Sequence, residues 1–426
     1  MSAFDRIIGY EAIKDEFLQI CDMLQNKDAY DALGAKLPQG ALLYGEPGLG
    51  KTMIANCFIE ESGLEAFTIR KNKGNEGFIN SITETFKEAK ENAPCIVLLD
   101  DIDKFANEDS YHRDAEEYVA VQAGIDETRN CGVFVLATVN DIEKLPSSLM
   151  RTGRFDRKIE VQRPTNSDAE KIITYYLSDK KVSDSINMED VSKMISYSSC
   201  AELETIINEA AINAAFNKKS SIEMEDIIHA VLRMQYDSPD SYEKISAEEL
   251  RRIALHEAGH LVVSEALCQG SVGLASIRSN GRASKGGFIH NCKELNRKED
   301  AALVALAGKA AVELCYSESS AKGCQYDLRN AARIIREEIS SSATRGLSMV
   351  DVTPKPYDEA SENMNSRIEA VVHSELEKSM LKSREILIKN KKFLDAATKA
   401  LVEKETLLYS DIRTIREENG IIEVAV

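Results

Sequence analysis

The sequence predicts an α/β domain, a parallel sheet with flanking helices, followed by a mainly helical second half. Three short apolar runs, at 41–44, 95–99 and 133–138, alternate with helix-like segments. This alternation is typical of parallel strands joined by crossover helices. From about Pro164 onward, the apolar spacing becomes helical. Because the chain has 426 residues, we expect two or three domains.

Composition and charge argue against several classes of protein. Hydrophobic residues make up 43% of the chain and charged residues 29%, as in a folded globular protein. The formal net charge of −18 repels nucleic acid and anionic membranes. The nine cysteines include no CxxC pair, which indicates free thiols in a reducing compartment. With no signal peptide or long apolar stretch visible, we expect a soluble, cytoplasmic protein that binds no nucleic acid and does not span a membrane.

Helix-start signals and apolar faces organise the segment after the third strand. Residues 167–170 (Ser-Asp-Ala-Glu) fit a capping box and predict a helix that starts there. Residues 202–216 have the spacing of a helix with one apolar face. The predicted buried face consists of Leu203, Ile206, Ile207, Ala210 and Ala214.

A polar stretch that contains proline, at 237–245, is the predicted linker to the second half. Residues 246–249 (Ser-Ala-Glu-Glu) form a second capping box and predict a helix that continues past Leu261. The Gly/Ser-rich stretch 270–287 predicts turns or short strands, and 363–418 predicts helices with solvated faces. These patterns divide the chain into an α/β domain at 1–163, a small helical subdomain at 164–236, the linker at 237–245 and a mainly helical domain at 246–426.

The first functional motif directly follows the first predicted strand. Residues 45–52 read Gly-Glu-Pro-Gly-Leu-Gly-Lys-Thr and fit the phosphate-loop pattern GxxxxGK[ST]. The glycines let backbone N–H groups surround phosphates at a helix N-terminus, where the helix dipole favours negative charge. Lys51 would reach the β- and γ-phosphates of ATP, and the Thr52 hydroxyl would bind Mg²⁺. The predicted nucleotide-binding residues of the loop are Gly45, Pro47, Gly48, Gly50, Lys51 and Thr52.

A pair of carboxylates follows the apolar run at 95–99. A buried strand that ends in carboxylates after a phosphate loop suits a magnesium site. We expect Asp100 to bind Mg²⁺ and Asp101 to polarise the attacking water.

Two further motifs make the first half resemble an AAA+ ATPase. Asn140 follows the third apolar run, and residues 151–157 read Arg-Thr-Gly-Arg-Phe-Asp-Arg. The resemblance implies that Asn140 senses the γ-phosphate, and that Arg151 and Arg154 act in trans on the nucleotide of a neighbouring subunit. Arginines that act in trans require a ring, so the resemblance also implies a homo-oligomer, usually a hexamer. Residues 164–236 would form the small helical lid of this module.

The second half contains the metal-binding pattern HExxH on the helix that starts at Ser246. His256 and His260 are four residues apart and therefore lie on one helical face, from which both imidazoles can reach one metal ion. Zinc lowers the pKa of bound water to about 7, and Glu257 can take its proton. A catalytic zinc takes a third protein ligand. Spacing alone leaves Glu313, Glu318, Asp327 and His290 as alternatives.

The order of these motifs resembles the FtsH family of AAA+ proteases. HEAGH at 256–260 is followed by LAGKAAVEL at 306–314 and YDLRNAAR at 326–333. The resemblance covers roughly residues 4–350 and implies that Asp327 is the third zinc ligand. It also implies an ATP-dependent zinc metalloprotease that unfolds, translocates and hydrolyses unfolded or damaged polypeptides, with Zn²⁺, ATP and Mg²⁺ as cofactors.

The chain departs from the family pattern ahead of the ATPase and at Asp101. Members usually carry a membrane anchor before the ATPase, whereas this chain begins at the ATPase itself. We expect either a soluble relative, or an anchor that lies on a partner or was removed. Asp101 stands where the family has the longer Glu, and a displacement of about 1 Å can cost about 10²-fold in rate.

The segment that would grip substrate in the ring's pore is also shorter than usual. Counting forward from the strand-like residues 67–69 places Phe78 in the gripping position, whereas counting back from Pro94 places residues 74–76 there. We favour Phe78, because an aromatic ring can grip a polypeptide; the alternative is that Phe78 packs in the core. These departures leave two alternative functions, an ATP-independent zinc peptidase and a weakly hydrolysing nucleotide-binding chaperone or scaffold.

Overall fold

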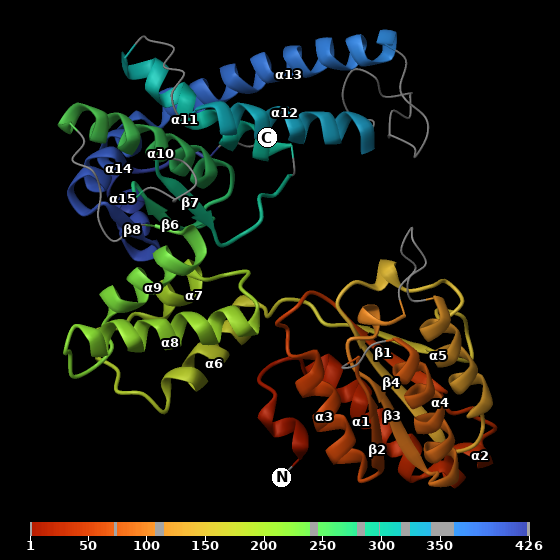
Figure 1. Ribbon diagram of the computed structural model, residues 1–426. Coiled ribbons are helices and arrows are strands. Elements are labelled where there is room, and N and C mark those ends of the chain that lie inside the picture. Colours follow the sequence, from red (N-terminus) through yellow and green to blue (C-terminus); the bar gives the residue numbers. More distant parts are fainter. Residues whose placement is uncertain are drawn as a thin grey trace. The chain divides into compact units, whose positions relative to one another are not determined.

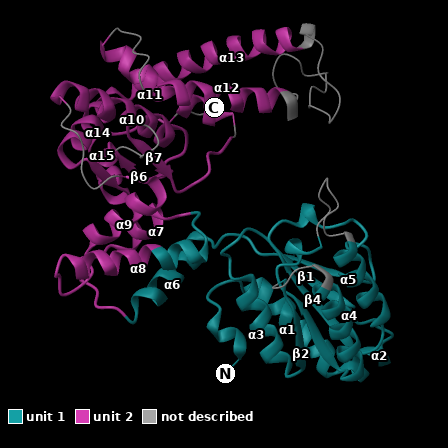
Figure 2. Cartoon of the chain, in the orientation of Figure 1, with its two compact units in different colours: residues 1–179, 197–205 teal, residues 180–196, 206–426 magenta. Residues whose placement is uncertain are grey.

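The computed structural model describes most of the chain (Figure 1). The described residues are 2–71, 75–106, 115–238, 246–278, 286–297, 299–316, 324–341 and 362–423. The chain divides into two compact units, one formed by Met1–Asp179 and Tyr197–Thr205, the other by Lys180–Ser196 and Ile206–Val426 (Figure 2). Within these described stretches, no helix combines the length and apolar character that crossing a bilayer requires.

The first unit is built on a five-stranded parallel sheet with strand order β2-β3-β4-β1-β5 (Figure 1). Its strands are β1 (Gly40–Tyr44), β2 (Glu65–Ile69), β3 (Cys95–Leu99), β4 (Val133–Val139) and β5 (Arg157–Glu160). The three strands predicted from the apolar runs are β1, β3 and β4, so the predicted α/β fold is confirmed. Because the strands are parallel, their carboxyl ends meet at one edge of the sheet, where ligands bind in such folds.

Helices pack on both faces of this sheet. The helices of this part of the chain are α1 (Glu11–Gln25), α2 (Lys27–Ala32), α3 (Lys51–Ser62), α4 (Asn75–Glu91) and α5 (Ala115–Glu127), with the short 3₁₀ helices η1 (Ala3–Arg6), η2 (Ile102–Lys104) and η3 (Ile142–Lys144). Helix α2 has no buried residue and does not contribute to the core. Successive residues of a strand point to opposite faces. Leu43 accordingly packs with Phe17 of α1 and Phe58 of α3, whereas Leu42 packs with Phe78 and other side chains of α4 and α5.

Helices α6 (Asn166–Leu177), α7 (Met188–Met194), α8 (Cys200–Phe216) and α9 (Met224–Tyr236) follow the sheet. The predicted cap at Ser167 is wrong, since α6 begins one residue earlier at Asn166. The cap is Thr165, whose extended backbone precedes the helix and whose hydroxyl accepts a hydrogen bond from the Asp168 N–H at 3.2 Å. The predicted apolar face of α8 is confirmed. Leu203, Ile206, Ile207, Ala210 and Ala214 are all buried.

The remainder of the second unit is mainly helical, with one small sheet. Its elements are α10 (Ala247–Leu267), β6 (Val272–Ser276), β7 (Phe288–Asn291), α11 (Asp300–Tyr316), α12 (Cys324–Ser341), α13 (Glu362–Lys389), α14 (Lys391–Lys404), β8 (Thr406–Leu408) and α15 (Tyr409–Asn419). The strands are antiparallel in the order β7-β6-β8. The predicted cap of α10 is confirmed, because the Ser246 hydroxyl accepts from the Glu249 N–H at 3.1 Å. Of the predicted linker, residues 239–245 lie outside the described residues.

The C-terminal helices differ from the prediction of solvated faces. The apolar face of α14, which includes Phe393, Leu394 and Leu401, is buried in the same core as α10 and α11. Strand β8 adds to the edge of the small sheet by pairing with β6. The charged residues of this region lie between apolar positions that recur at helical spacing, so one helical face is buried and the other is solvated.

Candidate nucleotide site and metal centre

The phosphate loop occupies the turn between β1 and α3. Gly50 precedes α3 with a φ of 86°, a left-handed conformation that favours glycine. The Lys51 ammonium donates to the carbonyl oxygens of Gly45 and Glu46, both at 2.7 Å. Burial lowers the pKa of Lys51, an effect that nearby carboxylates partly offset. The start of α3 therefore presents a lysine and backbone N–H groups to an anion.

The residues predicted to bind Mg²⁺ lie together at the edge of the sheet. The Thr52 hydroxyl donates to Oδ1 of Asp100 at 3.1 Å, and the Thr138 hydroxyl donates to the same oxygen at 2.9 Å. Thr138 also accepts from the Asp101 N–H at 2.8 Å. The sequence analysis missed Thr138, whose only signal is its place near the end of the strand next to β3. A hydroxyl beside a buried carboxylate fits the donor set that Mg²⁺ prefers.

Asp101 and Asn140 also lie together. The Asn140 side-chain amide donates to Oδ1 of Asp101 at 3.3 Å, and Lys104 donates to Oδ2 at 2.5 Å. Burial raises the pKa of Asp101, but the hydrogen bonds and charge of Lys104, together with Asn140, outweigh it and lower the pKa. The carboxylate is thus ionised at neutral pH and already has two partners.

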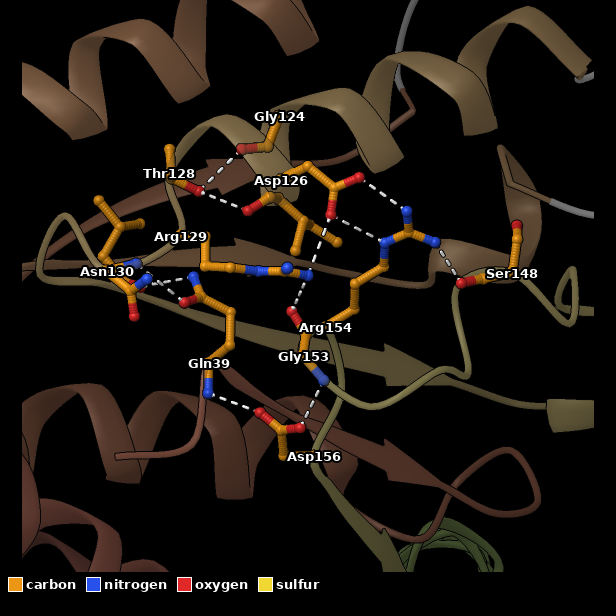
Figure 3. Close-up of polar contacts among 12 residues, drawn as sticks. Gln39, Gly124, Asp126, Thr128, Arg129, Asn130, Ser148, Gly153, Arg154 and Asp156 are labelled. Atoms are coloured by element: carbon orange, nitrogen blue, oxygen red, sulfur yellow. Dashed lines mark hydrogen bonds and ion pairs between the residues drawn. The ribbon is translucent and has the colours of Figure 1, made fainter. Parts of the chain in front are cut away.

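The two predicted trans-acting arginines have different surroundings, and Figure 3 shows those of Arg154. The Arg154 guanidinium donates a hydrogen bond to each carboxylate oxygen of Asp126 on α5, at 3.1 and 2.7 Å, and also donates to the Ser148 carbonyl. Arg129 bridges Asp126 and the Gly153 carbonyl, so the loop is tied to α5 at two points. Arg151 is exposed, and no hydrogen bond or ion pair of it is found among the described residues.

The prediction that Phe78 grips substrate is wrong. Its ring is only 2% exposed and packs edge-on against Phe105, with the ring centroids 5.2 Å apart. Phe78 lies on the inner face of α4, so the helix turns this side chain toward the sheet and not toward solvent. The alternative, a core residue near a helix start, is what the structure shows.

Three metal-ligating side chains converge between α10 and α12. Nε2 of His256 lies 3.0 Å from Oδ2 of Asp327 and 3.1 Å from Nε2 of His260, which is 3.7 Å from the same carboxylate oxygen. Zinc with ligands at about 2.0–2.1 Å in a tetrahedron separates its ligand atoms by about 3.3 Å. The three donors therefore fit a zinc ion. Burial would lower the pKa of His256, but the hydrogen bond to the Asp327 carboxylate outweighs it and raises the pKa.

The surroundings of the histidines also fit a metal. Nδ1 of His260 lies 2.7 Å from the Val304 carbonyl, so Nδ1 carries the proton and Nε2 turns its lone pair to the cluster. A β-carbon at Gly308 on α11 would lie 2.5 Å from Nε2 of His260 and 2.6 Å from Nε2 of His256. The space that a metal needs is therefore open only because Gly308 has no side chain. Within HEAGH, Gly259 lets α10 approach Ala307 of α11 closely.

Glu257 is buried one residue after His256. Its Oε1 accepts a hydrogen bond from the Gly287 N–H at 3.1 Å. Burial raises the pKa of Glu257, which suits a group that must exchange a proton. Gly287 directly precedes β7, and a side chain there would overlap both Ser276 and Glu257. The sequence analysis missed Gly308, for which the only signal is a glycine inside a helical segment, and Gly287, which ends the Gly/Ser-rich stretch.

The other candidates for the third ligand have different partners. Glu313 accepts from Lys309 at 2.5 Å, one turn away on α11. His290 bonds to Tyr236 and Ser196. Glu318 lies outside the described residues. Of the alternatives that spacing left open, the structure brings Asp327 to the two histidines.

Comparisons with known proteins agree with both sites. The family described as ATPase family associated with various cellular activities (AAA) matches residues 41–163, and Peptidase family M41 matches residues 243–415. A protein of Symbiobacterium thermophilum, ATP-dependent zinc metalloprotease FtsH 2, is 32% identical over 97% of this chain and 74% of its own length. The chain belongs to the FtsH family. The predicted FtsH resemblance and the enzyme class, an ATPase-coupled zinc metalloprotease that uses Zn²⁺, ATP and Mg²⁺, are confirmed.

Other FtsH proteins are similar over the same length. ATP-dependent zinc metalloprotease FtsH of Mycoplasma pneumoniae is 31% identical over 98% of this chain and 62% of its own length. FtsH 3 of Synechocystis sp. is 28% identical over 98% of this chain and 73% of its own length. The chain thus spans between about three fifths and three quarters of these FtsH relatives.

Proposed function

We propose that this FtsH-family chain forms a homo-oligomeric ring, a hexamer, that uses ATP to unfold and translocate unfolded or damaged polypeptides and cuts them at its zinc site. The ATPase domain comprises 1–163 with a lid at 164–236, and the peptidase domain comprises 246–426. One observation carries the proposal: two histidines and Asp327 converge beside a buried glutamate, in a chain that also pairs Thr52 with Asp100 behind a phosphate loop.

In the peptidase domain, His256, His260 and Asp327 hold the metal. Zinc bound there would lower the pKa of a water molecule to about 7 and polarise the scissile carbonyl. Glu257 accepts a proton from the attacking water and later donates it to the leaving amine. The Gly287 N–H fixes one carboxylate oxygen of Glu257, which keeps the other oxygen oriented for this transfer.

In the ATPase domain, the loop residues hold the phosphates and Asp100 holds Mg²⁺. These loop residues are Gly45, Pro47, Gly48, Gly50, Lys51 and Thr52. Asp101 polarises the attacking water and Asn140 senses the γ-phosphate. Arg151 acts in trans on the neighbouring subunit's nucleotide. Arg154 acts there as well, after exchanging its pair with Asp126 for that nucleotide.

The proposal is tested by the cleavage of a loosely folded fluorescent protein in the presence of zinc, with and without ATP. We expect cleavage to need both ATP and Glu257. The Glu257→Gln variant serves as the blank, and Glu248→Gln on the exposed face of the same helix serves as the matched control. Fragment release by Glu257→Gln at the rate of the unmodified protein would refute the assignment of the general base.

A second candidate function is a zinc peptidase that cuts short or already unfolded chains without ATP. The burial of Phe78 favours it, because the aromatic that the sequence offered for gripping substrate lies in the core. This candidate predicts that Glu257-dependent cleavage of both the fluorescent protein and a short peptide is indifferent to ATP. ATP-dependent cleavage of the protein but not of the peptide would exclude it.

A further inference from the structure

His290, a half-buried histidine outside the metal cluster, bonds through both ring nitrogens. It lies on β7, where Nδ1 is 2.6 Å from the Tyr236 hydroxyl and Nε2 is 3.0 Å from the Ser196 hydroxyl. Tyr236 ends α9 and Ser196 follows α7, whereas β7 belongs to the peptidase domain. All these residues lie in the second compact unit. The histidine thus joins the proposed lid of the ATPase domain to the peptidase domain.

The direction of these hydrogen bonds follows from proton counting. Burial lowers the pKa of His290 to about 4, so the ring is neutral near pH 7 and offers one donor and one acceptor. Ser196 donates its single hydroxyl proton to the Lys193 carbonyl at 3.2 Å, so Ser196 must accept from Nε2–H. Nδ1 therefore accepts from Tyr236, whose pKa is raised by burial and which keeps its proton. The result is one directed chain from Tyr236 through His290 and Ser196 to Lys193.

The helix α7 has a second attachment to the peptidase domain. The buried Asp190 accepts from the backbone N–H of Ser410 at 2.8 Å and from its hydroxyl at 2.7 Å, at the start of α15. The Lys193 carbonyl, where the hydrogen-bond chain from Tyr236 ends, lies against Gly273 in β6 so closely that a β-carbon there would overlap it. Ser196 and Lys193, at the end of the hydrogen-bond chain from His290, are therefore held in place relative to the small sheet.

Strand β7, which carries His290, also begins beside the general base Glu257. Phe288 and His290 are two residues apart on one face of β7, and the Phe288 ring stacks on Tyr236 with the centroids 3.8 Å apart. Gly287, immediately before Phe288, donates its N–H to Glu257. Three residues of extended chain, about 10 Å, separate His290 from Gly287, whose N–H meets the carboxylate, and the stacked Phe288 lies between them. Among the described strands, β7 lies at an edge of the sheet and pairs with β6.

We propose that His290 is a positioning residue: it fastens β7 to α7 and α9 and thereby holds the Gly287 N–H on the carboxylate of Glu257. This inference rests on the proposed function, in which Glu257 is the general base. The orientation of the peptidase's base then depends on the lid of the ATPase domain, through one directed hydrogen-bond chain. Weakening that chain leaves the metal ligands in place and lets the base turn.

The test is the cleavage of a short fluorogenic peptide, which needs no unfolding, by the full chain loaded with zinc. Tyr236→Phe keeps the ring stacked on Phe288 and removes only the hydroxyl. We expect kcat to fall about 10- to 100-fold, as for other groups that orient a ligand or a catalytic residue. We expect KM and bound zinc to stay unchanged, because the change touches neither the metal ligands nor the stacking of the ring. Tyr316→Phe, the same change on α11, is the matched control.

Two variants of His290 each keep one of its two hydrogen bonds and remove the other. An Asn amide can replace Nδ1 and keep the Tyr236 bond, whereas a Gln amide can replace Nε2 and keep the Ser196 bond. We expect His290→Asn and His290→Gln each to lose less activity than His290→Phe, which keeps a ring and loses both bonds. His373→Gln on the solvent face of α13 is the control for the histidine change.

Hydrogen exchange gives a reading that does not depend on activity. We expect the backbone amides of 286–291 to exchange faster in Tyr236→Phe and in His290→Phe, while the amides of α10 stay unchanged. Unchanged kcat or unchanged exchange in both variants would overturn the inference, and so would a loss of activity that matches a loss of bound zinc. If the unmodified chain cuts neither protein nor peptide, the proposed function fails, and exchange alone decides whether His290 holds β7.

Discussion

At the metal cluster, a missing side chain matters as much as the ligands. A β-carbon at Gly308, on the neighbouring helix, would lie 2.5 Å from Nε2 of His260 and 2.6 Å from Nε2 of His256, in the space that a metal ion needs. Helix α11 also supplies the Val304 carbonyl that fixes the tautomer of His260. One turn of α11 therefore both orients a ligand and leaves room for the ion.

We expect Gly308→Ala to weaken zinc binding by at least about tenfold, since the new methyl group would displace the imidazoles from the position of the ion. Chelator competition measures this affinity. Gly286→Ala is the control, because a β-carbon at Gly286 meets no atom within 4 Å. Full zinc affinity in Gly308→Ala would mean that α11 moves aside and that the cluster is less rigid than its packing indicates.

The neutral state of His290 predicts a pH dependence of stability. The pKa is about 4 in the folded protein and about 6.5 in an unfolded chain, so between these values the unfolded state binds a proton that the folded state does not. The contribution is present above pH 6.5 and is lost as pH falls toward 4, at up to about 1.4 kcal/mol per pH unit. Thermal unfolding of the unmodified protein and of His290→Gln measures it. We expect the stability advantage of histidine over glutamine to shrink steadily across this range, and a constant difference would contradict the prediction.

At the scale of elements, one arginine holds a loop to a helix while the other does not. Arg154 pairs with Asp126 through two parallel hydrogen bonds and is only 12% exposed, whereas Arg151 is exposed (Figure 3 shows the Arg154 cluster). Paired arginine and carboxylate groups of this geometry are among the stronger polar contacts, although solvent around Asp126 weakens this one. The same motif therefore contains one arginine with a structural partner and one that is exposed to solvent.

We expect Arg154→Ala to lower the free energy of unfolding by about 1 kcal/mol and Arg151→Ala to leave it unchanged. If Arg151 acts in trans, Arg151→Ala should also reduce ATP hydrolysis by about 10³-fold or more without preventing ATP binding. Thermal unfolding, nucleotide binding and phosphate release measure the three quantities. ATP hydrolysis at the normal rate by Arg151→Ala would remove this residue from the catalytic site.

At the scale of the whole molecule, the two chemistries belong to separate compact units, each with its own core. The nucleotide residues lie in the unit of the parallel sheet, and the metal cluster lies in the mainly helical unit (Figure 2). Helices α7 and α9 belong to the second unit, where His290 contacts their ends. Because the three residues that could hold the metal all come from the second unit, we expect that the two sites can be inactivated independently.

We expect a zinc chelator to abolish cleavage and leave ATP hydrolysis unchanged, provided that Mg²⁺ is kept in excess. Lys51→Ala should do the reverse, abolishing ATP hydrolysis while a short peptide is still cut. Phosphate release and peptide cleavage are measured on the same samples, and zinc added back should restore cleavage. Loss of ATP hydrolysis on removal of zinc would show that the second unit is needed for the fold of the first.

Much of the fold and both sites could be predicted from the sequence, because their signals are local. The phosphate loop works through consecutive backbone N–H groups, and HExxH works through two residues four apart on one helix. The strands before Gly45 and Asp100 are short and uniformly apolar, as buried parallel strands are. Zinc, ATP and Mg²⁺ follow from these patterns, and the comparisons with FtsH proteins support them.

The tertiary structure alone decided the contacts between residues that are far apart in the chain. Asp327 comes 71 residues after His256, and four residues at four distances fitted the metal equally well until packing brought one of them to the histidines. The burial of Phe78 likewise depends on which face of α4 meets the sheet. The contacts of Gly287, Gly308 and His290 also depend on how separate elements pack. A periodic pattern specifies which elements form and which of their faces are apolar. Which side chains meet across two elements depends on how those faces pack, and that is settled by the whole core at once.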